Sequence, residues 1–229
     1  EHEAFFPLIM DSEASCEIAG QSYQSLPVTG SSTNPQAANH PDLNIGLRGY
    51  ELTDAELKLV TLGEVWDRQA PQLPALFADN RVPQFSNAYH RYRWDWDCQC
   101  PTDTYSPWDT TLLGMAVTPG EIIHVPDSGY DIGGGYEVMV LYAGKTRITF
   151  HIGNSDKLDG YVMHVEDVCI EPDLLAKYNT LHEQGRDRLP VLKGRQPFGR
   201  ALGSEIKVAM RDNGHFLDPR SRNSWWIGR

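Results

Sequence analysis

The chain has 229 residues, 40% of them hydrophobic, and a formal net charge of −11. No run of about 18 apolar residues occurs, which excludes a transmembrane helix, and an acidic chain without a basic run argues against nucleic acid as a partner. The 20 glycines and 15 prolines, together with few helix-periodic segments, favour a mainly β protein rich in loops.

Residues 1–84 are predicted to form an extended N-terminal arm packed on a core domain. The first fifty residues are polar, rich in turn signals such as His40-Pro-Asp, and short of apolar periodicity. Because the chain begins at Glu1 without a methionine or an apolar leader, we expect a mature secreted protein or a trimmed chain. The β-rich core domain is then expected over residues 85–229.

An aromatic strand is predicted near the start of the core domain. Between residues 89 and 100 aromatic and charged residues alternate, so that Tyr92, Trp94 and Trp96 share one face. This aromatic face is either part of the core, which is the commoner case, or a platform on which a sugar ring stacks. The charged face is typical of a ladder of cross-strand ion pairs.

Four cysteines are expected to form disulfides, which implies an oxidising, extracellular compartment: Cys16, Cys98, Cys100 and Cys169. In a regular strand Cys98 and Cys100 would lie about 6.6 Å apart, too far for a comfortable bond. We therefore expect each to pair separately, one with Cys16 and one with Cys169, tying the arm to the core. The rival hypothesis is a metal site, but Cys-x-Cys lacks the spacing of a zinc knuckle.

The last third of the chain carries the clearest strand signals. Four segments mix β-branched and aromatic residues as strands do: 135–142, 147–152, 161–170 and 205–212. The breaks at Ala143-Gly-Lys and Asn213-Gly suit hairpins. In the third segment, His164 shares a face with Val162 and Glu166. Together these segments predict an antiparallel β-barrel or sandwich.

A helix and a tryptophan-rich tail complete the predicted elements. A short helical insertion is expected near residues 172–185, because Leu174 and Tyr178 fall on one side of a helix. Near the C-terminal end, Trp225 and Trp226 are adjacent. Neighbouring residues point opposite ways in a strand, so we expect one to pack and the other to be an exposed contact.

Four pieces of the core domain occur in a recognisable order: Pro119-Gly-Glu-Ile-Ile-His-Val-Pro, Gly133-Gly-Gly-Tyr-Glu-Val, Tyr161-Val-Met-His-Val and Glu205-Ile-Lys-Val-Ala-Met-Arg-Asp-Asn-Gly. Over residues 115–219 this order resembles the lysostaphin-type peptidoglycan endopeptidases, zinc enzymes built on the duplicated hybrid motif. The resemblance implies a compact antiparallel β core with that motif.

The resemblance also implies that the metal is lost. The family holds zinc with the His and Asp of His-x-x-x-Asp and the last His of His-x-His. Here Glu205 and Lys207 stand at the His-x-His positions, and a protonated lysine has no lone pair for a cation. The upstream motif has no clean counterpart, since His90 and Asp95 are one residue too far apart. Only His164 matches a family catalytic position, so we expect neither a metal nor a cofactor.

The leading functional hypothesis is a secreted pseudoenzyme that binds or scaffolds cell-wall polymer, another extracellular glycan, or a protein partner. Its candidate contacts are the aromatic strand together with Arg211, Trp225 and Trp226. This hypothesis rests on the lost ligand set and on the aromatic residues.

Three alternatives remain open. An extracellular polysaccharide hydrolase or lyase could use His164, Glu205 and Lys207 as acid, base and cation, with Arg211 steadying the carboxylate of an acidic sugar. A buried ion pair is the commoner role for such residues. The others are a metallopeptidase-like hydrolase with rearranged ligands and a self-assembling protein whose strand edges pair between copies.

Overall fold

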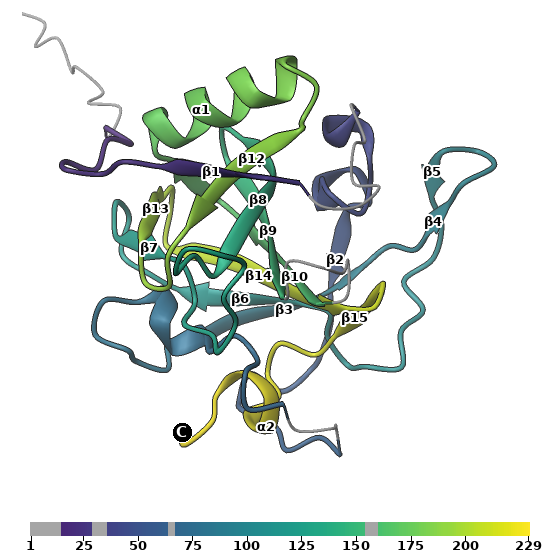
Figure 1. Cartoon of the computed structure of the whole chain (residues 1–229). Helices are drawn as coiled ribbons and strands as arrows, with labels where there is room; N and C mark the ends of the chain where they lie inside the picture. The colour runs from purple at the N-terminus through teal and green to yellow at the C-terminus, as the bar shows by residue number, and fades with distance from the viewer. Residues whose placement is uncertain (1–14, 29–35, 64–66, 154–159) are drawn as a thin grey trace, which may run out of the picture.

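The computed structural model describes residues 15–28, 36–63, 67–153 and 160–229, and antiparallel strands dominate it (Figure 1). This confirms the predicted mainly β class. In this part of the chain the largest sheet has ten strands. It is open rather than a closed barrel, because its strand order ends at β1 on one side and β2 on the other. Both of these end strands come from the region expected to form an arm.

The large sheet runs in space through β1 (Gln24–Pro27), β12 (Arg188–Leu192), β8 (Val138–Gly144), β9 (Arg147–Gly153), β10 (Gly160–Glu166), β14 (Glu205–Asp212), β6 (Leu112–Ala116), β3 (Phe85–Arg91) and β2 (Tyr50–Leu52). A further strand, β15 (His215–Leu217), pairs with β14. A second sheet contains β11 (Val168–Ile170), β13 (Pro197–Ala201) and β7 (Ile122–His124). The predicted strands at 161–166 and 205–212 are therefore direct neighbours, as β10 and β14.

Backbone conformation at the turns decides where the predicted strands begin and end. Asn213 and Gly214 join β14 to β15 with φ of 45° and 82°, a left-handed conformation that Asn and Gly adopt readily. The predicted hairpin of β8 and β9 forms, with Gly144 opposite Arg147. The predicted strand 161–170 is interrupted at Asp167, where φ is 62°. Its two halves become β10 and β11, which belong to different sheets.

The main apolar core joins the two sheets. On β14, Ile206, Val208 and Met210 all face it, as the alternation of the sequence predicts. The rings of Phe150 on β9 and Phe198 on β13 meet edge to face, with centroids 5.0 Å apart. The short 3-10 helix η3 (Leu73–Leu76) is also buried in this core.

The predicted helical insertion is confirmed as α1 (Pro172–Glu183), which packs against β12 and β8 (Figure 1). Pro172 suits the first turn because it needs no amide partner there. The side chain of Glu171 accepts a hydrogen bond from the Leu174 amide at 2.9 Å and caps the helix. Among the described residues, no helix combines the length and apolarity needed to span a membrane.

The opposite face of the large sheet, here called the outer face, is covered by the segment 36–49. This segment contains the 3-10 helices η1 (Ala37–Asn39) and η2 (Ile45–Leu47). Thr149 donates to the carbonyl of Leu43 at 2.5 Å, and Arg147 donates to the side chain of Asn44 at 2.9 Å. The outer face therefore carries polar and charged side chains beneath a short stretch of chain, together with a small apolar cluster of Ile45, Leu112, Ala209 and Phe216.

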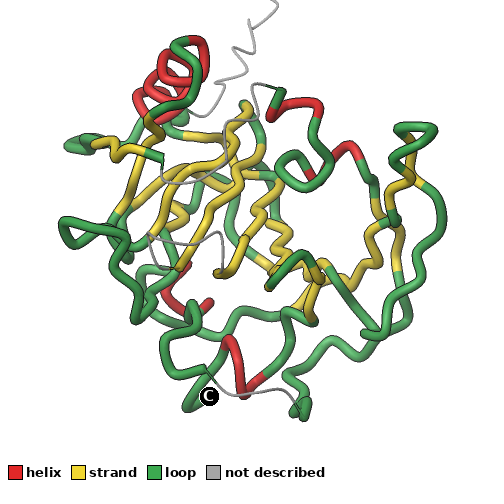
Figure 2. Tube along the Cα trace, turned by 45° about the vertical axis from the view of Figure 1, so that its right-hand side comes forward, coloured by secondary structure: helices red, strands yellow, loops and turns green. Residues whose placement is uncertain are grey.

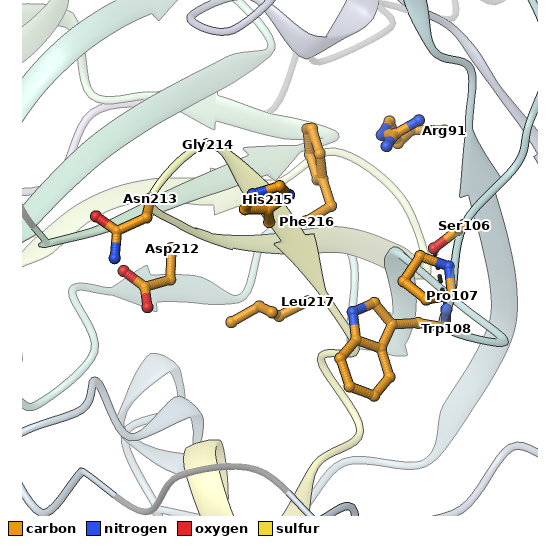
Figure 3. Close-up of a pocket in the computed structure, with 10 residues that line it drawn as sticks. All are labelled: Arg91, Ser106, Pro107, Trp108, Asp212, Asn213, Gly214, His215, Phe216 and Leu217. Atoms are coloured by element: carbon orange, nitrogen blue, oxygen red, sulfur yellow. Dashed lines mark hydrogen bonds between the residues drawn. The ribbon is translucent and has the colours of Figure 1, made fainter.

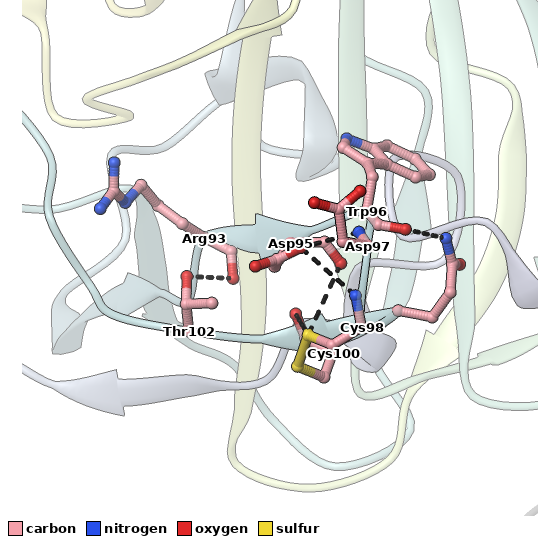
Figure 4. The surroundings of a disulfide bond; sticks show 8 residues. Arg93, Asp95, Trp96, Asp97, Cys98, Cys100 and Thr102 are labelled. Carbon is pink, nitrogen blue, oxygen red and sulfur yellow. Dashed lines mark hydrogen bonds between the residues drawn. A yellow bond between two sulfur atoms is a disulfide. The ribbon is translucent and has the colours of Figure 1, made fainter.

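The disulfide pairing differs from the expected one. Cys16 bonds Cys169, and Cys98 bonds Cys100 (Figure 4). The expectation that Cys98 and Cys100 pair separately is wrong because they do not lie in a regular strand. A turn precedes Cys100, and Gln99 within it has φ of 54°, which brings the two Cα atoms to 5.3 Å. The bond from Cys16 does tie the N-terminal region to the core domain, as expected, but through Cys169 of β11 and not through Cys98 or Cys100.

The predicted aromatic strand is also shorter than expected. Its first part is the end of β3, which pairs with β2 as far as Arg91 opposite Tyr50. Beyond this point the chain pairs with itself, forming a small hairpin of β4 (Trp94–Asp95) and β5 (Cys100–Pro101). This hairpin projects from the body of the molecule (Figures 1 and 2).

Candidate functional site

The predicted trio of His164, Glu205 and Lys207 is split between two places on the outer face. In the pairing of β10 with β14, Lys207 lies opposite Glu166, and His164 lies opposite Ala209. Glu205 is four residues from Ala209, which is roughly 13 Å along a strand. This spacing does not bring His164 and Glu205 to one substrate atom.

Glu205 is surrounded by hydrogen-bond donors. One of its carboxylate oxygens accepts from the hydroxyl of Ser86 and from the amide of Asn87 at 2.5 Å, and the other accepts from Tyr89 at 2.8 Å. The Nζ of Lys207 lies 3.3 Å away. Burial pushes the pKa of Glu205 upward, but these donors outweigh it and hold the pKa below its usual value. Glu205 is thus a fixed carboxylate whose acceptor sites are occupied.

Lys207 is held equally firmly, and we call Asp167, Glu205 and Lys207 the lysine cluster. Lys207 forms ion pairs with both carboxylates, and its side chain is only 14% exposed. Burial alone would lower the pKa of Lys207, but the hydrogen bond to Asp167 and the other neighbouring groups outweigh burial. The pKa of Lys207 is therefore raised above its usual value, and the side chain remains cationic. On β6, Gly114 makes room for the cluster, because a Cβ there would lie 2.3 Å from a carboxylate oxygen of Glu205. This closed arrangement favours a structural role.

Glu166 is an ionisable group beside the lysine cluster that the sequence did not single out for chemistry. It is 2% exposed and lies 3.1 Å from the guanidinium of Arg147. Burial raises its pKa to about 7, although Arg147 opposes the shift. The segment 36–49 covers this pair, since Arg147 also bonds Asn44.

His164 is fully buried. Its Nδ1 lies 3.0 Å from the hydroxyl of Thr149, and its ring stacks on Phe216 with centroids 5.9 Å apart. Burial, followed by the nearby charge of Arg211, lowers the pKa of His164 well below its usual value. His164 is therefore a neutral packing residue without access to solvent.

The three aromatic candidates do not form one surface, because the strand that would align them ends early. Tyr92 donates to Glu51 at 2.7 Å. Trp96 is 51% exposed in the hairpin, and its ring centroid lies 5.3 Å from that of His40. Trp94 is half-buried. Within the described chain they occupy separate environments, and Trp96 is the most open of them.

Both C-terminal tryptophans are buried, so the expectation that one of them is an exposed contact is wrong. They lie in and directly after the short helix α2 (Arg222–Trp225), where the alternation of a strand does not apply. Their indole N–H groups donate to the carbonyls of Asp218 and Pro219 at 2.9 and 2.8 Å. Trp225 and Trp226 are core residues.

A pocket of about 450 Å³ lies between the β14–β15 hairpin and the loop 106–108 (Figure 3). Trp108 forms part of one wall, and its carbonyl is bound to His90 of β3 at 2.9 Å, which anchors the loop. Asp212, Asn213 and His215 line it from the hairpin. In such a pocket an indole can stack on a sugar ring, and a carboxylate and an amide can bond the hydroxyls of the sugar.

The sequence predicted only a hairpin turn at one wall of this pocket and gave no role to the other. Pro107-Trp108 and Asn213-Gly214 are far apart in the chain, and no local pattern links them. They meet because β3, β6 and β14 are consecutive strands of the sheet. The aromatic signal that could have found the site was Trp108, outside the alternating segment that drew attention to Trp94 and Trp96.

Comparisons with known proteins give no indication of the function of this chain. A scan against models of protein families, a search of curated proteins and a search of solved structures each found no match for this chain. Among residues 15–28, 36–63, 67–153 and 160–229, no group of three or more His, Cys, Asp or Glu side chains is arranged to hold a metal ion.

Proposed function

We propose that this chain is a secreted binding module for an extracellular glycan, and that the pocket between the loop 106–108 and the β14–β15 hairpin receives a sugar ring. The observation that carries the proposal is the joint presence of Trp108, Asp212 and Asn213 in one pocket. The C–H face of a sugar stacks on an indole, and its hydroxyls bond to carboxylate and amide groups.

The cysteines support the secreted part of the proposal. Both cysteine pairs of the described chain form disulfides, one joining the N-terminal region to β11 and one closing the β4–β5 turn. Disulfides of this kind form and persist in oxidising compartments.

A zinc-free relationship to the lysostaphin-type endopeptidases is part of the same proposal. It is supported by the pairing of β10 with β14, the strands that carry the resembling motifs. Glu205 and Lys207, at the positions of the family's histidines, form an ion pair with each other, and Lys207 also pairs with Asp167. A protein that only binds a glycan does not require Glu205 or Lys207 to act as catalytic residues.

The proposal is tested by titration calorimetry of the whole chain against a panel of polysaccharides and peptidoglycan fragments. Replacing Trp108→Ala should weaken binding at least about tenfold, the effect of losing a central aromatic contact. Trp96→Ala is the matched control, because it removes an exposed tryptophan from the hairpin instead. Silence across the panel, or loss of binding in Trp96→Ala with Trp108→Ala unaffected, would overturn the proposed pocket.

A further inference from the structure

Three guanidinium groups gather around one phenylalanine ring beside the pocket. The Cζ atoms of Arg91, Arg211 and Arg48 lie 4.8, 4.9 and 5.8 Å from the centroid of Phe216. We call these three residues the arginine cluster. Arg48 and Arg211 are buried, and Phe216 is only 5% exposed. Like charges so close together in a poorly hydrated place require counter-charge.

In the described part of the chain, one carboxylate forms ion pairs with this cluster. Asp42 forms ion pairs with Arg48 at 2.5 Å and with Arg211 at 3.3 Å. Arg211 also donates to the carbonyls of Asp42 and Gly214. Arg91 has no ion pair there, and its Nε and Nη1 are buried without a hydrogen-bond partner. Arg48 and Arg211 therefore share the ion pairs to Asp42, and Arg91 is the member of the cluster without one.

Arg91 is also the member that lines the pocket (Figure 3). It stands at the end of β3, where the chain leaves the sheet. Burial, followed by repulsion from Arg48 and Arg211, lowers its pKa to about 10, so it remains charged at neutral pH. An anionic group in the pocket would relieve the burial of an unpaired cation and the repulsion among the arginines.

We infer that Arg91 marks an anion subsite of this pocket, which takes one carboxylate or sulfate group of the ligand. With the proposed function, on which this step rests, the ligand is an acidic glycan built from uronic acid or sulfated sugar. Asp212 and Asn213 lie away from Arg91 across Phe216 (Figure 3). The carboxylate of Asp212 would repel the acidic group of the ligand and accept hydrogen bonds from its hydroxyls. These two preferences would set the orientation of the sugar in the pocket.

The experiment compares four probes on the whole chain: a uronate oligosaccharide, a sulfated one, a neutral one of equal length, and inorganic sulfate. Binding is measured by calorimetry and by the NMR shift of the arginine Nε–H groups. Arg91→Gln removes the charge. Arg81→Gln is the matched control, because Arg81 also covers a phenylalanine, with its Cζ 4.2 Å from the Phe77 centroid, but has its own ion pairs.

Acidic oligosaccharides should bind about tenfold or more tightly than the neutral one, and Arg91→Gln should erase that preference while Arg81→Gln retains it. Arg91→Lys, which keeps the charge, should preserve part of it. Whether the uronate or the sulfated probe binds more tightly identifies the acid group. The net charge of −11 makes general attraction of anions unfavourable, so dependence on Arg91 is diagnostic.

The two proposals fail separately in this design. Equal binding of acidic and neutral sugars, unchanged in Arg91→Gln, would overturn the anion subsite and leave the glycan function standing. Binding of inorganic sulfate that depends on Arg91, without binding of any sugar, would support the subsite and overturn the glycan function. Sulfate binding of equal strength in Arg91→Gln and the unaltered chain would overturn the subsite.

Discussion

Strand β14 carries two charged clusters on the same face, and they are built on opposite plans. At its start, Lys207 of the lysine cluster is paired with two carboxylates, and Glu205 accepts from every neighbouring donor. At its end, Arg211 belongs to a cluster of three arginines, of which only Arg48 and Arg211 form ion pairs with Asp42. The first cluster is complete within the chain. The second leaves Arg91 without an ion pair in the described chain, and in the proposed anion subsite a group of the ligand supplies the missing negative charge.

The largest expected effect on stability comes from the ionisation of Glu166, which lies beside the lysine cluster. Its pKa in the folded chain is about 7, against an ordinary value of 4.5, so the folded state holds the proton over this window while the unfolded state has lost it. The free energy of unfolding should therefore fall as pH rises from about 4.5 to 7, by up to about 3 kcal/mol. Urea unfolding at pH 5 and pH 8 measures this fall.

The matched variant for this prediction is Glu166→Gln, which cannot ionise. Its stability should change much less between pH 5 and pH 8, and at pH 8 it should exceed that of the unaltered chain. An equally steep pH dependence in Glu166→Gln would assign the effect to another group.

A smaller loss is expected from Lys207→Met, which removes the cation of the lysine cluster. Glu205 and Asp167 then face each other without a counter-ion, and the free energy of unfolding should fall by about 2 kcal/mol. The loss is smaller than for a fully buried pair, because the Asp167 side chain is 41% exposed. Chemical denaturation of Lys207→Met, Glu205→Gln and the double variant should show strong non-additivity. Additive effects would mean that the cluster does not act as a unit.

Much of the fold could be predicted because strand signals are local. The alternation of Ile206, Val208 and Met210 and the Asn213-Gly214 turn are fixed by neighbouring residues, and both were predicted correctly. The Cys98–Cys100 bond was missed because strand geometry was assumed for residues that form a turn. The same assumption made one of the C-terminal tryptophans an exposed contact.

The candidate site could not be predicted in the same way, because its parts meet only through strand register. Arg48, Arg91 and Arg211 come from a covering segment and two strands that are not adjacent, β3 and β14. The spacing of these arginines in the sequence does not show that they lie close together in the fold. The sequence did point to Arg211 as a residue that could steady an acidic sugar, but the arginine that lines the pocket is Arg91.

The smallest expected effect on the free energy of unfolding is an increase, in contrast to the loss expected from Lys207→Met, and it distinguishes the two clusters most clearly. Arg91→Met keeps the aliphatic packing over Phe216 but removes a cation whose Nε and Nη1 have no partner. Replacing a half-buried charge that has no ion pair in the described chain by an apolar group should raise the free energy of unfolding by about 1 kcal/mol. Lys207→Met should lower the free energy of unfolding, so replacing a cation by methionine is expected to have opposite effects on stability in the two clusters. Denaturant midpoints of the two variants, measured side by side without added anions, decide the matter. If Arg91→Met is as destabilising as Lys207→Met, the arginine cluster is already complete and has no need of a ligand.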